Sequence, residues 1–489
     1  MSKSSKRLVV VSNRLPIALK KQGDSFEVHP GKGGLVTALA PVLRDRGGDW
    51  IGWTGATGDV DVQAHLDTYS RKAGYNLVAV PLSQEQVQGY YQGFSNEVIW
   101  PLFHDLQTLC NFDPAFFQSY LEVNQKFASA IANQSDEDAY VWVQDYHLMH
   151  AAWSLKQQNH KRRCGFFLHI PFPPPDIFLK LPWRKQIIEA LLEFDLVGFQ
   201  TVRDRRNFVQ CVGLLRPDAK LSGRGQVVSV NYEQRELRVG YFPISIDFKE
   251  FQDLARTRVA ADLAHQVHAA FRRRILILGA DRLDYSKGIP ERIQAMLTLY
   301  SKYPEVREKL SLVQIVVPSR EDILGYKDKK LKIESMVSEV NGKYSQPGWV
   351  PIHYLYRNLS REELVAYYRV AAIALVTPLK DGMNLVAKEY CACDVSGQGV
   401  LVLSEFAGAA AQLQRGALLV NPHDVEGVAD AVYRAYVMGT DEKQTRMHKL
   451  KTIIRKYDIY WWVDSFLNAG FGTRLDDFRQ DSVDFHTER

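Results

Sequence analysis

Short apolar runs rich in β-branched residues alternate with helical patterns along the whole sequence, and this alternation constrains the fold most. In the first half the runs are 7–12, 140–144, 164–170 and 195–200, and the first is followed by a helical pattern over 34–46. The runs are apolar almost throughout, which is typical of parallel strands buried on both faces. The pattern therefore predicts an α/β protein.

The same rhythm restarts after Pro243, and 489 residues suit two domains better than one. We predict an N-terminal Rossmann-like domain over 1–243, a C-terminal Rossmann-like domain over 244–455, and a helical segment over 456–489 that packs back on the first. Ligands of such sheets bind at the carboxyl ends of the strands. Further strands are expected at 275–279, 312–317, 352–356, 372–376 and 400–404, and a polar hairpin at 226–239.

Composition narrows the functional class. Hydrophobic residues make up 46% and charged residues 24%, as in soluble globular proteins. The net charge of +5 does not call for nucleic acid and would suit an anion bound in a cleft. No apolar run approaches the ~20 residues of a membrane span, and Leu8–Val11 is too short for a signal peptide, so we expect a cytoplasmic protein. The five scattered cysteines indicate reduced thiols.

Three segments of the first half place polar residues or glycines after a strand. Arg14 follows the first predicted strand, and Gly31-Lys32-Gly33-Gly34 precedes a helix, where backbone N–H groups can bind a phosphate or simply form a tight turn. Asp145, His147 and His150 could hold a metal, or could be a helix cap and packed histidines. His169 precedes a proline-rich loop that would fix its position, in a structural role or in contact with a sugar.

Two segments of the second half point to a nucleotide. Arg282 and Lys287 lie five residues apart after a strand and could bind a diphosphate, unless the loop is merely solvated. The turn 381–384 leads into a helix, so its backbone donors would face an anion. Glu389 lies one turn into that helix, where a carboxylate can accept both hydroxyls of a ribose.

At these segments the sequence resembles the retaining trehalose-6-phosphate synthase family, over about Arg7 to Phe466. The matching stretches are VVVSNRLP, GYYQGFSNEVIWPLFH, DYHL, GFFLHIPFP, GFQT, RLDYSKGIPER, NGKYSQPGWVPI, TPLKDGMNLVAKEY and VLVLSEFAGAA. The resemblance implies two facing Rossmann-like domains of the GT-B type with the active site in the interdomain cleft. It also implies transfer of glucose from UDP-glucose to glucose 6-phosphate with retention of configuration, without a metal or other cofactor.

The resemblance also implies a role for each matching residue. Glucose 6-phosphate would be held by Arg14, Tyr91, Trp100 and Arg320, with Asp145 near the reacting hydroxyl. The donor glucose would contact Gly34 and His169, and its diphosphate Arg282 and Lys287. Donor glucose and phosphates would lie in the turn formed by Asp381, Gly382, Met383, Asn384, Leu385 and Val386, and the ribose on Glu389. The residues assigned to catalysis are Asp145, His169, Arg282 and Lys287.

One position departs from the family pattern: Gln144 stands before Asp145, where many members carry histidine. The alternatives to the implied function are another phosphorylated acceptor such as glycerol 3-phosphate, a catalytically silent sugar-phosphate sensor, and a metal-dependent hydrolase. Uridine is the family's usual donor base, but some relatives use guanosine or adenosine. We expect a homo-oligomer, no nucleic-acid or membrane partner, and a separate trehalose-6-phosphate phosphatase, because the sequence lacks the phosphatase domain of some relatives.

Overall fold

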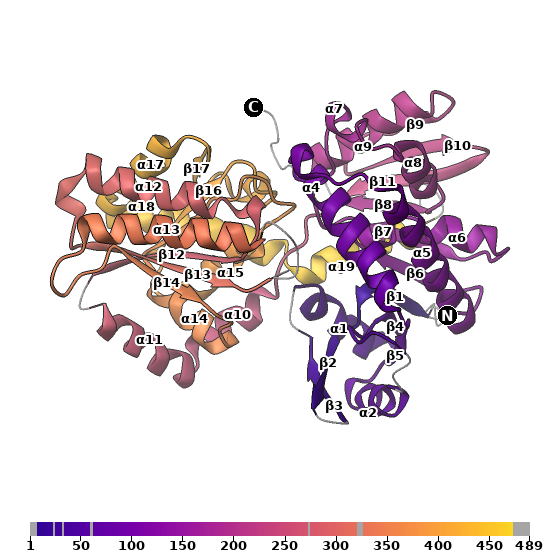
Figure 1. Ribbon diagram of the computed structural model, residues 1–489, viewed down its shortest axis with the longest axis horizontal. Coiled ribbons are helices and arrows are strands. Elements are labelled where there is room, and N and C mark those ends of the chain that lie inside the picture. The colour runs from indigo at the N-terminus through magenta and orange to yellow at the C-terminus, as the bar shows by residue number, and fades with distance from the viewer. Residues whose placement is uncertain are drawn as a thin grey trace. The chain divides into compact units, whose positions relative to one another are not determined.

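A computed structural model describes residues 7–22, 25–31, 34–58, 62–271, 274–319 and 326–472. The chain divides into two compact α/β units (Figure 1). Unit 1 contains the described residues up to Pro243 together with those from Tyr460 onward, and unit 2 contains Ile244–Ile459.

Unit 1 is built on a mixed sheet of nine strands among its described residues. In spatial order they are β5 (Asn76–Ala79), β4 (Gly48–Trp53), β1 (Leu8–Arg14), β6 (Tyr140–Gln144), β7 (Arg163–Phe167), β8 (Leu196–Phe199), β11 (Arg235–Tyr241), β10 (Val227–Tyr232) and β9 (Lys220–Ser222). The first seven strands in this spatial order, ending with β11, pair in parallel with their neighbours. Strand β10 pairs antiparallel with β11. The predicted hairpin is therefore confirmed.

Unit 2 contains a six-stranded parallel sheet among its described residues. Its strands follow the order β14 (Ile352–Tyr356), β13 (Leu310–Val317), β12 (Ile275–Arg282), β15 (Ile373–Val376), β16 (Val400–Ser404) and β17 (Leu418–Val420). The first strand lies in the middle, the next two lie on one side and the last three on the other, which is the Rossmann order. In unit 1, strands β5, β4, β1, β6, β7 and β8 lie in the same order, once the separate hairpin β2–β3 is left out of the count. The predicted α/β class with two Rossmann-like units is therefore confirmed.

Each sheet has a point at which the strand order reverses, and this point locates its ligand crevice. In unit 1 the reversal lies between β1 and β6, which pair in parallel from Leu8–Tyr140 to Ser12–Gln144. In unit 2 it lies between β12 and β15. The residues that follow these four strands are therefore the first candidates for function.

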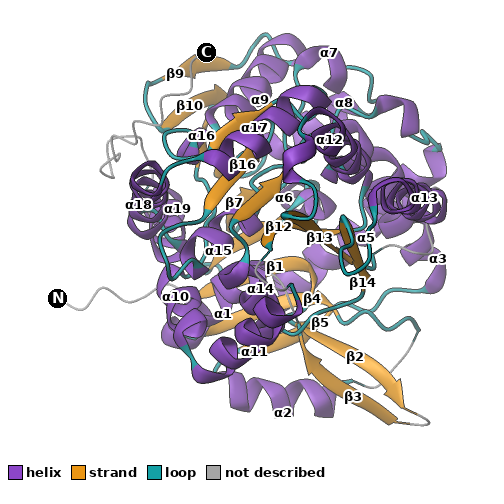
Figure 2. Ribbon diagram, turned by 90° about the vertical axis from the view of Figure 1, so that its left-hand side faces the viewer, coloured by secondary structure: helices purple, strands orange, loops and turns teal. Residues whose placement is uncertain are grey.

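Helices occupy the connections between the strands (Figure 2). Those of unit 1 are α1 (Gly34–Arg46), α2 (Gln63–Ala73), α3 (Gln84–Gln86), α4 (Trp100–Phe103), α5 (Pro114–Gln134), α6 (Ala151–Gln157), α7 (Pro175–Phe178), α8 (Arg184–Leu192), α9 (Val202–Leu215) and α19 (Ile459–Phe471). Those of unit 2 are α10 (Phe248–Arg256), α11 (Arg258–Ala270), α12 (Ile289–Lys302), α13 (Tyr326–Tyr344), α14 (Arg361–Val370), α15 (Leu385–Cys393), α16 (Ala410–Leu413), α17 (Val425–Val437) and α18 (Thr440–Lys456). The antiparallel hairpin β2 (Ile17–Gln22) and β3 (Ser25–Pro30) projects from unit 1 in both ribbon views.

Helix α19 packs on the unit 1 sheet through aromatic side chains. The ring of Phe466 stacks on that of Trp142 at 4.4 Å between centroids and 9° between planes. Gly165 and Gly198 make room for it, because a Cβ at either position would come within 3.0 Å or less of the Phe466 ring. Small residues in these strands therefore let the last described helix lie close against the sheet.

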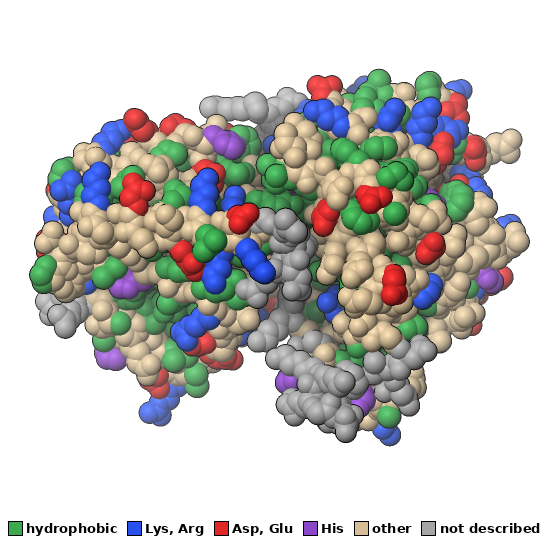
Figure 3. Space-filling view, viewed as in Figure 1, with side chains coloured by type: hydrophobic (Ala, Val, Ile, Leu, Met, Phe, Trp, Pro, Cys, Tyr) green, Lys and Arg blue, Asp and Glu red, His purple; other side chains and the backbone are tan. Residues whose placement is uncertain are grey.

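No helix within the described residues is both long and apolar enough to cross a membrane. Basic, acidic and apolar side chains are interspersed over the described part of the face in Figure 3, so no single-sign patch dominates that face. All five cysteines lie in described segments and are free thiols, as predicted.

Candidate active site

Arg14 is the exposed last residue of β1, whose preceding six residues are buried. The hydroxyl of Ser12 donates to its carbonyl oxygen at 2.6 Å and fixes the strand end. Its guanidinium carbon lies 4.0 Å from the centroid of the Trp53 ring and 5.9 Å from that of Tyr91. No described carboxylate pairs with this guanidinium, so its charge is available to an anion.

Tyr91 and Trp100 come from a wide π-helix (η1, Val87–Ile99) and the turn of α4 that continues it. Such helices are rare and frequently occur at functional sites. The Tyr91 ring stacks on that of His147 at 5.9 Å and 15°. Trp100 is buried, with its ring 4.3 Å from that of His104 and 5.8 Å from that of Tyr146.

Asp145 follows β6 in a backbone conformation that most residues avoid, with φ 72° and ψ 167°. Its N–H donates to the Phe167 carbonyl at 2.8 Å, and its Oδ1 accepts from the His169 N–H at 3.2 Å. These two hydrogen bonds join the ends of the neighbouring strands β6 and β7. Unusual conformations of this kind cluster at active sites.

His169 is held by Gln144, with Nε2 2.9 Å from the Gln144 Oε1. Its ring packs 4.7 Å from that of Phe167 and 6.1 Å from that of Trp462. Loss of water around the imidazole lowers its pKa to about 3. His169 is therefore neutral near pH 7, and because Gln144 Oε1 can only accept, it favours the tautomer with hydrogen on Nε2.

Asp145, His147 and His150 do not form a metal site, since no described group of three His, Cys, Asp or Glu side chains could hold an ion. His147 packs on Tyr91, and His150 lies buried against Trp153 at 4.6 Å between ring centroids. Burial lowers the His150 pKa to about 4. Of the two interpretations given from the sequence, packed histidines fit these ring contacts and metal ligands do not.

One predicted site residue and part of one glycine-rich segment lie beyond what the structure describes. Arg320, Lys32 and Gly33 fall outside the described residues. Gly34 begins α1, which confirms the predicted helix over 34–46. The Gly31 N–H donates to the Pro16 carbonyl at 2.6 Å, so the chain entering this turn is anchored to the end of β1.

In unit 2 the predicted diphosphate residues lie beside the reversal point. Arg282 is the exposed last residue of β12. Lys287 is buried, and its Nζ lies 2.6 Å from the Asp381 Oδ2. These residues are 94 positions apart in the chain, and the ion pair joins the loop after β12 to the turn after β15.

The turn 381–386 is held from several directions. Asn384 has φ 74°, caps α15 and donates from Nδ2 to the Asp381 Oδ2 at 3.2 Å. The N–H groups of Gly408 and Ala409 donate to the Asp381 and Met383 carbonyls at 3.1 and 2.8 Å. Gly382 and Met383 are buried, whereas Leu385 and Val386 at the start of α15 are partly exposed. The turn is thus rigid, and it leads directly into a helix N-terminus suited to an anion.

Glu389 lies on α15, partly buried, and its Oε2 accepts a hydrogen bond from the Tyr368 hydroxyl at 2.8 Å. Burial raises its pKa, and the Tyr368 hydrogen bond and the charge of Arg361 oppose that shift. A carboxylate with one oxygen held by protein can still accept hydroxyls at its remaining lone pairs.

Sequence reasoning missed Arg292, which organises this site from within the core. It is 1% exposed and its NH1 lies 2.5 Å from the Asp281 Oδ2. It also donates to Gln314 Oε1, Thr377 Oγ1 and the Lys287 carbonyl at 3.0, 3.1 and 3.3 Å. One buried cation therefore ties together β12, β13, the residue after β15 and the Lys287 loop. The available signal was helical spacing, because Arg292 lies on the same face of α12 as the apolar residues Ile289 and Met296.

Polar residues gathered at the carboxyl ends of two Rossmann-like sheets, with cations and a helix N-terminus among them, define an α/β enzyme that acts on anionic ligands. A model of glycosyltransferase family 20 matches residues 6–469. The chain belongs to this family and is therefore a glycosyltransferase.

Relatives and solved structures agree with this membership. Trehalose-6-phosphate synthases of Mycolicibacterium vanbaalenii and Mycolicibacterium smegmatis are both 43% identical, over 94% of this chain and 95% and 92% of theirs. The Burkholderia xenovorans α,α-trehalose-phosphate synthase (UDP-forming) in complex with glucose-6-phosphate is 35% identical, with a TM-score of 0.86 over 95% of this chain and 100% of that one. An E. coli structure bound with UDP-2-fluoro glucose is 37% identical, with a TM-score of 0.86 over 96% and 99%.

Proposed function

We propose that this enzyme is an α,α-trehalose-6-phosphate synthase, which transfers glucose from UDP-glucose to glucose 6-phosphate with retention of configuration and releases UDP. The observation that carries the proposal is that these residues lie at both reversal points. Arg14 ends β1 and Asp145 follows β6, while Arg282 ends β12 and Lys287 lies in the loop after it. The relatives with bound glucose-6-phosphate and UDP-2-fluoro glucose support the choice of substrates.

In the proposed reaction, unit 1 binds the acceptor. Arg14 contacts its phosphate with a charge that no described carboxylate neutralises. Tyr91 and Trp100 contact the sugar. Arg320, which belongs to the sequence range of unit 2 and falls outside the described residues, adds a second cation. Asp145 positions the acceptor hydroxyl and does not act as the base; its Oδ1 accepts the His169 N–H, which fixes the orientation of the carboxylate. Neutral His169 accepts a hydrogen bond from the transferred glucose at Nδ1, because its Nε2 hydrogen is donated to Gln144.

Unit 2 binds the donor. Cleavage of the sugar–phosphate bond leaves negative charge on the departing UDP, which Arg282, Lys287 and the N–H groups of the turn 381–386 stabilise. The reaction uses no metal, and the leaving phosphate accepts the proton of the attacking hydroxyl, which enters from the same face. Lys287 exchanges its Asp381 partner for the diphosphate, and Glu389 accepts the ribose hydroxyls.

The test is an assay of UDP release from UDP-glucose with chelator present, with and without glucose 6-phosphate. Release that requires glucose 6-phosphate would support donor, acceptor and metal independence together. Release with glycerol 3-phosphate alone, or none with any donor and acceptor, would refute the proposal in favour of another acceptor or a sensor. The anomeric configuration of the product, read by NMR coupling constants, tests retention.

Lys287→Ala tests the role of the diphosphate cations. Removing one prearranged donor commonly lowers kcat by about 10²- to 10³-fold, so we expect a loss in that range. Lys249→Ala is the matched control, since Lys249 is exposed and pairs with Asp253 on its own helix. Turnover of Lys287→Ala within about threefold of wild type would contradict the assignment, which rests on a larger expected loss.

We also propose that the enzyme acts as a homo-oligomer in the cytoplasm and that a separate phosphatase consumes its product. Light scattering of the purified protein tests the first point, and a mass of one chain at assay concentration would refute it.

A further inference from the structure

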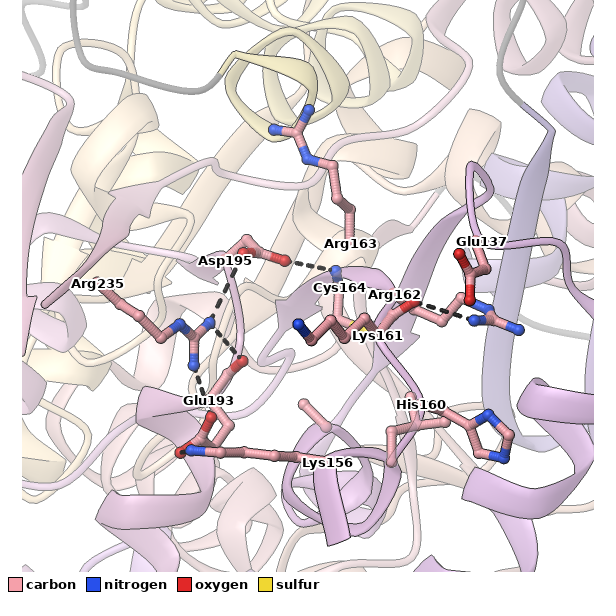
Figure 4. A pocket seen from close by; sticks show the side chains of 12 residues that line it. Glu137, Lys156, His160, Lys161, Arg162, Arg163, Cys164, Glu193, Asp195 and Arg235 are labelled. Carbon is pink, nitrogen blue, oxygen red and sulfur yellow. Dashed lines mark hydrogen bonds and ion pairs between the residues drawn. The ribbon is translucent and has the colours of Figure 1, made fainter. Parts of the chain in front are cut away.

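Unit 1 contains a cavity of about 410 Å³ at the edge of its sheet opposite to Arg14 and Asp145 (Figure 4). It lies where β6, β7 and β8 begin, whereas the candidate active-site residues follow the ends of strands. Five residues of β6 at ~3.3 Å each separate the two edges by roughly 17 Å. The volume falls in the range of small-molecule sites. The reaction proposed above does not use this cavity.

One wall of the cavity carries charges that neutralise each other. Arg235 NH1 lies 2.6 Å from the Glu193 Oε2, and its NH2 lies 3.6 Å from the Asp195 Oδ1. Lys156 Nζ lies 2.7 Å from the other Glu193 oxygen. Figure 4 shows these side chains pointing toward one another. This wall offers fixed carboxylate oxygens, which accept hydrogen bonds from hydroxyl groups.

The other wall carries cations whose hydrogen-bond partners are uncharged. Arg162 donates to the Ser135 hydroxyl and carbonyl oxygens at 3.1 and 2.8 Å. Arg163 donates to the Gly470, Phe471 and Gly472 carbonyls at 3.1, 3.1 and 2.6 Å. The ammonium of Lys161 has no ion pair with any described residue, and its side chain extends into the cavity in Figure 4.

The lining as a whole therefore favours an anion. It contains five Lys and Arg side chains against three carboxylates, with Glu137 as the third. Ala152, Leu155 and Cys164 add an apolar part to the lining. Burial raises the pKa of the Cys164 thiol, which keeps it neutral. A ligand that fits has one anionic group, several hydroxyls and a carbon skeleton.

We propose that this cavity is a second, non-catalytic site for a sugar phosphate. The phosphate contacts Lys161 in the positive field of Arg162 and Arg163, and the hydroxyls face Glu193 and Asp195. The proposal stands independently of the proposed reaction, because it rests on the opposite edge of the sheet.

Lys161 is itself the reporter for the test. The full-length protein is acetylated with an N-hydroxysuccinimide ester, with glucose 6-phosphate, inorganic phosphate or glucose at matched ionic strength, and each lysine is quantified by peptide mass spectrometry. At a sugar-phosphate concentration about nine times Kd, the rate at Lys161 should fall about tenfold. Glucose should leave it unchanged, inorganic phosphate should protect less than the sugar phosphate, and Lys249 should not respond.

Variants separate this site from the active site. Protection of Lys161 should persist in Arg14→Ala, which removes the proposed acceptor cation, and should weaken in Arg162→Gln. Arg71→Gln on the exposed face of α2 is the matched control and should protect like wild type. An unchanged Lys161 rate, equal protection by sodium chloride, or protection that disappears in Arg14→Ala would each overturn the proposal.

Discussion

The sharpest structural prediction concerns Arg292→Met. The substitution keeps most of the side-chain volume and removes the charge. It leaves the Asp281 carboxylate, whose side chain is 3% exposed, buried without the cation 2.5 Å away. It also removes the donors to Thr377 and to the Lys287 carbonyl.

The magnitude follows from this geometry. Breaking a buried ion pair by removing one partner costs about 3–5 kcal/mol, because an uncompensated charge remains inside. We expect this cost to appear in unit 2. Replacing both partners, in Arg292→Met with Asp281→Asn, should recover at least about 2 kcal/mol of it, since no buried charge is then left alone.

The assay must measure the stability of unit 2 alone. Tryptophan fluorescence would report mainly on unit 1, because eight of the nine tryptophans lie in its residues. Hydrogen exchange of β13 amides, read by mass spectrometry under native conditions, meets this need. A loss of 3–5 kcal/mol should speed their exchange by roughly two to four orders of magnitude, at about 1.4 kcal/mol per tenfold. Exchange within about fivefold of wild type, or a double variant as unstable as the sum of the two single ones, would refute the reasoning.

Three further predictions follow from single contacts. Glu389→Gln should weaken UDP binding about 10- to 100-fold by calorimetry, since hydrogen bonds to a charged group contribute about 1.5–3 kcal/mol; unchanged affinity would contradict the ribose assignment. His150 has a folded pKa of about 4, below the ~6.5 of the unfolded chain. The free energy that the neutral imidazole contributes to folding is therefore present in full above pH ~6.5 and is lost as the pH falls. Between pH 7.5 and 5, urea unfolding should show wild type losing about 2 kcal/mol more than His150→Gln, and parallel losses would contradict this. Gly288→Ala should destabilise unit 2 by more than about 1 kcal/mol, because φ is +65° and a Cβ would lie 2.2 Å from the Thr377 carbonyl oxygen; a loss below that in the β13 exchange assay would contradict it.

The parallel strands were predictable because each is a short apolar run. The runs 140–144, 352–356 and 400–404 match β6, β14 and β16 residue for residue. The run 164–170 was too long, since β7 ends at Phe167 and the next residues turn to meet Asp145. Strand β4 was missed because its sequence, GDWIGW, contains glycines and a buried aspartate that Arg7 pairs at 2.7 Å.

The site was predictable in its positions but not in its contacts. Arg14, Asp145 and Arg282 follow strands, and the sequence pattern locates strand ends. The strand order that brings β12 beside β15 cannot be read from local pattern, so neither could the pairing of Lys287 with Asp381. The same holds for the cavity of unit 1, whose lining comes from helix α6 and from residues near the beginnings of several strands, where no motif marks them.

Gln144 shows how a departure from the family pattern can be read physically. A histidine at this position could accept the His169 N–H through an unprotonated ring nitrogen, and the glutamine does so through Oε1 at 2.9 Å. The requirement at this position would then be an acceptor, not an imidazole.

Gln144→His should therefore keep kcat within about threefold of wild type, since the ring of His169 stays in one tautomer. Gln144→Leu leaves a buried N–H without a partner, which costs about 1–3 kcal/mol, and should lower kcat by about 5- to 100-fold. The ¹⁵N shifts of the His169 imidazole separate positioning from general damage, because they should report hydrogen on Nε2 in wild type and Gln144→His and a mixture in Gln144→Leu. A single Nε2–H tautomer in Gln144→Leu together with full activity would show that Gln144 only fills space, whereas loss of activity in Gln144→His would show that the amide has a further role.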